Sequence, residues 1–295
     1  MDRQAELVAL IDKHSTEGMH PSAIPRLSLI RATAPSEPIH TLYDASLCLV
    51  VQGKKQVQLG ERVLEYDSGT FLAVSVDMAV VGRVIEASRE RPYLCFALTL
   101  DRAAVAALAL EMGPPPAGEP GPGMALGPMN ADLLDAALRL VRLLETPRDI
   151  PVLAPMAERE LLYRLLAGPN GARLRQIAHA ESKLSQVSRA ISWIKHNYRE
   201  AFSIEALAAE ARMSASALHL HFKQVTALSP LQYQKQIRLH EARRLILSTA
   251  MDAASAAHEV GYDSPSQFSR EYRRLFGAPP LRDAARLREA GLAAP

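Results

Sequence analysis

Residues 261–280 read GYDSPSQFSREYRRLFGAPP, a stretch that joins a tight turn, a short helix with a basic outer face and a closing Gly/Pro stop. Gly261 can adopt the left-handed conformation that ends one helix sharply. Asp263 or Ser264 can cap the next helix, and Pro265 suits its first position because no amide donor is needed there. The stretch therefore predicts a turn followed by a short helix that begins at Pro265.

The helix that begins at Pro265 has two contrasting faces. Helical spacing places an apolar stripe toward the interior, formed by Phe268, Tyr272 and Leu275. The opposite side carries Gln267, Arg270 and Arg274, and side chains of these types hydrogen-bond to base edges or phosphates of DNA. For one such helix alone, a solvated surface helix with arginines for solubility is the alternative.

A second copy of this plan lies about fifty residues upstream, where residues 213–230 read MSASALHLHFKQVTALSP. The inward stripe of this copy consists of Leu218, Phe222 and Val225. Its outward positions are Ser216, His219, Leu220 and Lys223. Each helix follows a short Ala-rich amphipathic segment, at 204–211 and 253–260, so each unit is predicted to be a helix-turn-helix.

A longer helix is predicted between the two units. Ser229 can cap it and Pro230 fits its first position, and the pattern continues to about Leu247. A rigid connecting helix would hold the two outward stripes at a fixed separation.

From about Ser185 to Leu287 the chain resembles the paired helix-turn-helix domain of the AraC/XylS family of bacterial transcription regulators. The resemblance implies one helix in each of two successive major-groove segments of double-stranded DNA. The family's base-reading positions fall on Ser216, His219 and Leu220 in the first unit, and on Ser266, Gln267 and Arg270 in the second. Three positions depart from the common pattern: Leu220 stands where Arg is frequent, Ala227 where Gly is usual, and Pro279 where Ser or Thr is frequent.

Charge is distributed unevenly along the chain. Residues 183–295 contain 16 Lys and Arg against 10 Asp and Glu, whereas residues 1–182 contain 18 against 22. A basic half beside an acidic half is expected when only one of them approaches phosphate.

Residues 27–99 have a different sequence pattern, in which short runs of β-prone residues are separated by turn residues. The predicted strands are 27–33, 46–52, 56–59, 62–66, 70–76, 80–86 and 93–100, which indicate a small barrel or jelly roll. Residues 46–55, SLCLVVQGKK, resemble the cupin-like N-terminal domain of one AraC-type subgroup, and the likeness covers roughly residues 20–165. It implies a sensory or dimerisation module.

Helices are predicted at 101–112, 130–145 and 151–167, with an exposed Pro/Gly-rich segment after the first. The apolar face of the second helix consists of Leu133, Leu134, Ala137, Leu140, Val141 and Leu144. This face is either a dimer interface or a cover for its own barrel.

We therefore expect an α+β protein of two domains. The first is a cupin-like β-barrel domain with helices over residues 1–168, with a Pro/Gly-rich loop at 113–128. A linker at 169–184 leads to an all-α domain over 185–295 with two helix-turn-helix motifs.

If the barrel binds an effector, its polar interior candidates are His40, Tyr43, Gln52, Tyr66, Arg83, Glu86 and Tyr93. A shift of one residue in strand phase would exchange the whole set. The alternative is that the barrel is only a dimerisation scaffold with a packed interior.

Catalysis is not expected. A metal-binding cupin needs clustered His and carboxylate ligands on facing strands, but residues 1–168 offer only His14, His20 and His40, so no metal or other cofactor is predicted. Cys48 and Cys95 lie in apolar strands, which favours buried structural cysteines over the reactive thiolates of an alkylation-repair protein. A minority hypothesis is that they sense electrophiles or oxidants.

The sequence thus predicts a sequence-specific DNA-binding transcriptional regulator, with activation the better expectation by family analogy. Its expected partners are promoter DNA, RNA polymerase, a small-molecule effector and a second copy of itself. The runner-up is a barrel enzyme or alkylation-repair protein fused to a DNA-binding module. The charged start and the short apolar run at 103–110 predict a cytoplasmic protein without a membrane span.

Overall fold

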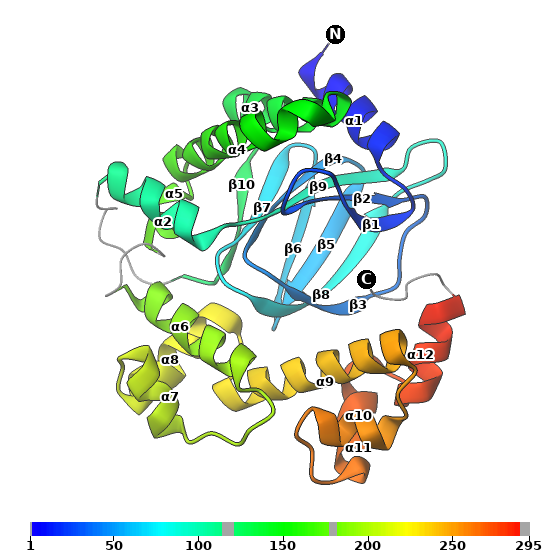
Figure 1. Cartoon of the computed structure of the whole chain (residues 1–295), viewed down its shortest axis with the longest axis vertical. Coiled ribbons are helices and arrows are strands. Elements are labelled where there is room, and N and C mark those ends of the chain that lie inside the picture. Colours follow the sequence, from blue (N-terminus) through cyan, green and yellow to red (C-terminus); the bar gives the residue numbers. More distant parts are fainter. Residues whose placement is uncertain (1, 114–120, 177–181, 290–295) are drawn as a thin grey trace.

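The computed structural model describes residues 2–113, 121–176 and 182–289. A β-rich N-terminal domain with two sheets lies above a row of C-terminal helices (Figure 1). The predicted α+β fold class is confirmed. Among the described residues, no helix combines the length and the apolar content that a membrane span requires.

The first sheet has six strands in the order β1-β2-β9-β4-β7-β10, and the second has four in the order β3-β8-β5-β6. Neighbouring strands within each sheet are antiparallel, as in β2 with β9 and β5 with β6. The bounds are β1 Gly18–Pro21, β2 Leu27–Ala32, β3 Ile39–Tyr43, β4 Ser46–Gln52, β5 Lys54–Leu59, β6 Arg62–Asp67, β7 Thr70–Val74, β8 Met78–Glu86, β9 Tyr93–Thr99 and β10 Met124–Pro128.

The seven predicted strands are all present, as β2 and β4 to β9, but three further strands were missed. β1 and β3 are short and carry mixed polar and apolar residues, so their alternation is weak. β10 lies within the predicted 113–128 loop and pairs with β7, where Met124 is opposite Val74. That pairing depends on a partner about fifty residues away, which local composition does not reveal. Residues 114–120 of the predicted loop lie outside the described residues.

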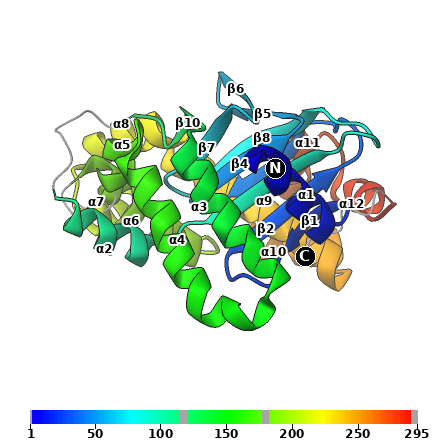
Figure 2. The same ribbon diagram turned by 90° about the horizontal axis from the view of Figure 1, so that it is seen from above.

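The helices described before residue 177 are α1 Arg3–His14, α2 Arg102–Glu111, α3 Ala131–Arg142, α4 Ile150–Ala167 and α5 Gly171–Arg175, the last of which lies in the predicted linker. Two single 3-10 turns, Leu143–Glu145 and Pro147–Asp149, join α3 to α4. In Figures 1 and 2, α3 and α4 lie across the six-stranded sheet. The apolar face of α3 is buried in one cluster with Leu47 and Phe96 of that sheet, so it covers its own domain.

The C-terminal helices are α6 Lys183–His196, α7 Ile204–Ala211, α8 Ala215–Thr226, α9 Pro230–Thr249, α10 Ala253–Glu259, α11 Pro265–Phe276 and α12 Pro280–Glu289. Helices α6 to α8 lie at one end of α9 and α10 to α12 at the other, in both views (Figures 1 and 2). The long α9 begins with a capping box in which Ser229 and Gln232 bond reciprocally to each other's backbone.

The hydrophobic cores divide the molecule differently from the two domains. The barrel interior and the first helix-turn-helix share one continuous cluster, which includes Val74, Met78, Phe222 and Val225. The second helix-turn-helix has a cluster of its own around Phe268 and its neighbours. The first unit is therefore packed directly on the barrel, where the Gly123 amide also donates to the Val225 carbonyl at 3.0 Å.

Candidate nucleic-acid interface

Helices α8 and α11 are defined by matching local signals. Ser214 accepts a hydrogen bond from the Ala217 amide at 3.2 Å, and Ser264 accepts one from the Gln267 amide at 3.3 Å. These N-caps satisfy amides that have no partner within the helix. Both helices end in the left-handed conformation, at Ala227 with φ 62° and at Gly277 with φ 79°.

The inward stripes lie where the sequence places them, with one adjustment. Leu218, Phe222 and Val225 of α8 are fully buried, as are Phe268 and Tyr272 of α11. Leu275 is only partly buried, and its neighbour Phe276 contributes more to the core.

The outward stripes are exposed in both helices. The eight residues are Ser216, His219, Leu220 and Lys223 on α8, and Ser266, Gln267, Arg270 and Arg274 on α11. Leu220 has 57% of its surface exposed, although burial of an apolar side chain would be favourable. Two exposed helical faces at opposite ends of α9 are thus free to meet a ligand.

Helix α9 connects the two units through its polar side chains as well as its length. The guanidinium of Arg238 donates to the carbonyl of Tyr198 at 2.6 Å in the α6–α7 loop and to the carbonyl of Gly261 at 2.7 Å in the second unit. Gln234 donates to the carbonyl of Glu200 at 2.6 Å. A Cβ atom on Gly261 would overlap the Arg199 carbonyl, so the close approach of the units there requires glycine.

A second set of contacts fixes α11 on α9. Glu271 accepts hydrogen bonds from Lys235 at 2.8 Å, from the Tyr262 hydroxyl at 2.8 Å and from Gln267 at 3.2 Å. Burial tends to raise the pKa of Glu271, but Lys235 and the two hydrogen-bond donors lower it overall, so the carboxylate stays ionised. Gln267 is therefore exposed yet held in place along the outer face.

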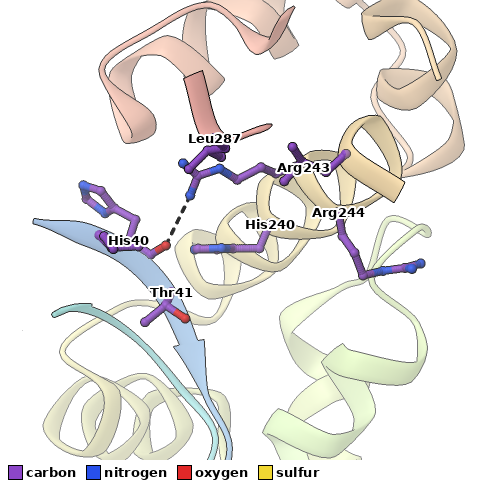
Figure 3. Close-up of a pocket in the computed structure, with 8 residues that line it drawn as sticks. His40, Thr41, His240, Arg243, Arg244 and Leu287 are labelled. Atoms are coloured by element: carbon purple, nitrogen blue, oxygen red, sulfur yellow. Dashed lines mark hydrogen bonds between the residues drawn. The ribbon is translucent and has the colours of Figure 1, made fainter. Parts of the chain in front are cut away.

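Asp283 anchors the end of the second unit. It is completely buried and accepts hydrogen bonds from Arg243 at 2.8 Å and from the Tyr272 hydroxyl at 3.0 Å. Arg243 also donates to the carbonyl of His40 in β3 at 3.4 Å, which ties the N-terminal domain to the second unit (Figure 3).

His40 lies in this interdomain region, in a cavity of about 240 Å³ that β3 forms with α9 and α12. His240 points from α9 toward β3 in Figure 3, and its Nε2 atom is buried without a hydrogen-bond partner. Burial, followed by the charge of Arg243, lowers the pKa of His40 and brings that of His240 to about 3. Both imidazoles are therefore neutral at neutral pH.

The other predicted effector residues separate into two groups. Tyr43, Tyr66 and Tyr93 belong to the barrel interior. Gln52 is partly buried, and its amide donates to the Pro92 carbonyl at 2.8 Å.

Arg83 and Glu86 do not face the interior, which corrects the expectation for these two. Both are exposed. β8 directs Val80 and Val84 inward and so leaves Arg83 on the outer face, whereas Glu86 is the last residue of the strand. There Arg83 donates to the Gln56 side chain at 2.8 Å.

One interior residue was missed. Lys55 follows the same alternation as the buried Val57 and Leu59 of β5, so the pattern could have revealed it. In the register it lies directly opposite Tyr66 of β6.

The two cysteines are free thiols within the barrel interior. Burial raises the pKa of Cys48, and it raises that of Cys95 to about 12, so both are protonated at neutral pH. Such thiols are weak nucleophiles. Within the described ranges, no three His, Cys, Asp or Glu side chains are grouped as metal ligands.

Comparisons with known families agree with this geometry. The family model described as the AraC-type transcriptional regulator N-terminus matches residues 23–173, and a helix-turn-helix domain model matches residues 207–286. The chain belongs to the AraC family of transcriptional regulators. The AraC/XylS resemblance of both halves is confirmed.

Among curated AraC-family proteins, the chain is 28% identical over 164 residues to the HTH-type transcriptional activator RhaS of Salmonella schwarzengrund (strain CVM19633). The match covers 55% of this chain and 58% of that protein. RhaS of Salmonella typhimurium (strain LT2) gives the same figures. The chain thus spans little more than half the length of these relatives.

Among solved structures, ToxT from Vibrio cholerae strain SCE256 with a bound unsaturated fatty acid superposes with a TM-score of 0.57 at 9% identity. It covers 88% of this chain and 94% of ToxT. ToxT from Vibrio cholerae O395 bound to (E)-4-(8-methylnaphthalen-1-yl)but-3-enoic acid gives 0.55 at 10% identity, covering 88% and 97%. At this identity the likeness shows a shared fold across both domains.

Proposed function

We propose that this AraC-family regulator binds its promoter by inserting α8 and α11 into successive major-groove segments on one face of double-stranded DNA. The observation that carries the proposal is that both outward stripes are exposed while both inward stripes are buried, at opposite ends of the single helix α9. A B-DNA major groove is wide enough to admit one α-helix.

The outward residues divide into base readers and phosphate contacts. Arg270 can bind guanine with two hydrogen bonds, and the Gln267 amide suits adenine. Ser216 and Ser266 can bond to either base edges or backbone, His219 can donate to a base acceptor, and the exposed Leu220 suits a thymine methyl group. Lys223 and Arg274 contribute phosphate contacts that make affinity depend on salt.

The function is regulation rather than catalysis, and the division of labour follows the two domains. We assign effector binding and dimerisation to residues 1–168, a linker to 169–184 and DNA binding to 185–295. RhaS, which the chain resembles, is a transcriptional activator, and this supports activation through contact with RNA polymerase. The ToxT structures with carboxylic acids bound support an effector-responsive N-terminal domain.

The test is DNA binding by arginine variants on the cognate promoter fragment. Arg270→Ala should weaken binding by about 1 to 3 kcal/mol and relax the preference at one base pair. Arg274→Ala should weaken binding to all sequences similarly and reduce the slope of log affinity against log salt by about 1.

The matched control is Arg148→Ala, which removes the same charge from an exposed turn in the N-terminal domain. It should bind DNA like wild type. Equal affinity of wild type and Arg270→Ala on the cognate promoter would refute the assignment of α11 as a base reader.

A further inference from the structure

Lys55 is a charged side chain on the inner face of the barrel. Its neighbour Lys54 faces outward and pairs with Glu65 at 2.8 Å, whereas within the described part of the chain no carboxylate pairs with Lys55. The Lys55 Nζ atom lies 5.4 Å from the centre of the Tyr43 ring. Lys55 is partly buried, and an ammonium that loses part of its hydration without gaining a counterion destabilises a folded protein.

The charge on Lys55 is nevertheless retained at neutral pH. Burial tends to lower the pKa of Lys55, but its interaction and hydrogen bond with Tyr43 raise that pKa overall, so the side chain remains protonated. Because burial raises the pKa values of both cysteines, neither thiol is ionised at neutral pH. Among the residues that the structure describes, the groups that act on Lys55 are neutral at pH 7 and no negative charge balances it.

Two hydroxyl groups in the same interior also have no partner. The Tyr66 hydroxyl, on a side chain only 1% exposed, and the Tyr93 hydroxyl, on one that is 0% exposed, are both buried without a hydrogen bond of normal geometry. The neighbour of the Tyr93 hydroxyl is the Cys95 thiol, a weak hydrogen-bonding group. Tyr66 lies directly opposite Lys55 in the β5–β6 register. Both tyrosines, like Lys55, interact electrostatically with Tyr43 and with the two thiols, so the three groups share one region of the barrel. Unpaired buried hydroxyls are rare because each one costs about 1 to 3 kcal/mol.

A glycine of β8, Gly82, lies beside Lys55 and Tyr43. Gly82 of β8 has the Tyr43 hydroxyl and the Cε atom of Lys55 as its nearest neighbours, at 3.4 and 3.5 Å from the position of a Cβ atom. Glycine at this position keeps the surroundings of the ammonium free of one further side chain.

We propose that the barrel interior binds a small organic monocarboxylate, with Lys55 as its counterion and the Tyr66 and Tyr93 hydroxyls as hydrogen-bond donors. One positive charge and two neutral donors balance a monoanion. A dianion such as phosphate would leave a net negative charge among the valine side chains of the interior. Carboxylate oxygens accept several hydrogen bonds at once, which suits convergent donors. The inference rests on the proposed role of the N-terminal domain as the effector-binding domain.

Thermal unfolding of the full chain tests the proposal, with sodium formate, acetate, propionate and butyrate as probes at constant ionic strength. A ligand that binds the folded state raises Tm in a concentration-dependent manner. At least one carboxylate should raise the Tm of wild type, and Lys55→Met should abolish the rise. Tyr66→Phe and Tyr93→Phe should each weaken the apparent affinity by about tenfold, the usual effect of losing one hydrogen bond to a charged group.

Lys54→Met is the matched control, because it removes the adjacent lysine from the outer face of the same strand. It should keep the full response. Propionamide, which is uncharged, should leave Tm unchanged. In carboxylate-free buffer, Lys55→Met should also raise Tm, since an apolar side chain replaces an unbalanced charge. Lys55→Gln replaces the Met variant if that variant fails to fold.

Three results would overturn the proposal: no carboxylate raises the Tm of wild type, wild type and Lys55→Met respond equally, or propionamide acts like propionate. Promoter binding by the same proteins, measured by gel shift, distinguishes a failure of carboxylate binding from a failure of the proposed DNA-binding function. Intact DNA binding without a carboxylate response removes this inference alone. Failure of wild type to bind any promoter fragment removes the proposed function.

Discussion

Helices α8 and α11 end at equivalent positions with different residues, and this predicts opposite effects of reciprocal substitutions. Ala227 ends α8 at φ 62°, and Gly277 ends α11 at φ 79°. An alanine in this left-handed region costs about 1 to 2 kcal/mol relative to glycine. Glycine in turn destabilises the folded state by about 0.5 to 1 kcal/mol, because it loses more backbone conformational freedom on folding than alanine does. This entropy loss offsets part of the difference.

Contacts with neighbouring atoms change the stability effects expected for Gly277→Ala and Ala227→Gly. Nothing lies within 4 Å of a Cβ atom on Gly277, so Gly277→Ala gains no contact and should destabilise the second unit by about 0.5 to 1 kcal/mol. Ala227 is partly buried and its Cβ faces Gly60 in the β5–β6 turn. Loss of that methyl contact subtracts about 0.4 kcal/mol, which leaves Ala227→Gly stabilising by about 0.1 to 0.6 kcal/mol.

Urea denaturation measures both changes. The single tryptophan of the chain, Trp193, lies in α6 and packs on Phe202, so its fluorescence follows the first unit. Far-UV circular dichroism follows the helices of both units. Ala227→Gly should move the fluorescence midpoint to higher urea, and Gly277→Ala should lower the midpoint of the helical signal. The reasoning fails if Ala227→Gly destabilises the protein as much as Gly277→Ala does.

Three other substitutions test the framework of the molecule. Gly261→Ala should destabilise the second unit by about 2 to 5 kcal/mol in urea denaturation, because Gly261 has φ 86° and an added Cβ would overlap the Arg199 carbonyl. An unchanged urea midpoint would contradict this close approach. Arg238→Lys should cost about 2 kcal/mol and weaken promoter binding, because one ammonium cannot replace donors to both units; unchanged affinity would show that α9 needs no such brace. Burial tends to raise the pKa of Asp77, but Lys195 and Arg102 lower it overall. The ionised Asp77 carboxylate therefore stabilises the folded state at pH values above 3.8, the ordinary pKa of aspartate, and this stabilisation is lost as the pH falls through the folded-state pKa. Tm profiles of wild type and Asp77→Asn should therefore converge below about pH 4, and a constant gap at every pH would exclude this linkage.

Much of the exposed face of α8 and α11 could be predicted from local sequence. The caps at Ser214 and Ser264 and the apolar stripes of α8 and α11 depend on neighbours within one or two helical turns. Helical periodicity then assigns the side chains opposite each apolar stripe to the outer face. This is why residues such as Arg270 could be placed on the surface before the fold was known.

The barrel interior was predicted only in part, because strand phase depends on pairing. Tyr43, Tyr66 and Tyr93 were placed among the interior groups, but Arg83 and Glu86 were not interior and Lys55 was missed. A side chain in a strand faces one side or the other according to a register that distant strands impose.

By itself, the sequence determined the two helix-turn-helix units, the helix that joins them and the β-rich character of the first domain, since each of these is encoded within a short span of chain. Only the tertiary structure decided that Arg83 lies outside the barrel, that β10 forms one edge of the six-stranded sheet, and that the first unit shares its hydrophobic core with the barrel while the second does not. The physical reason is that these features arise from contacts between residues far apart in the chain, whose free energy no local pattern contains.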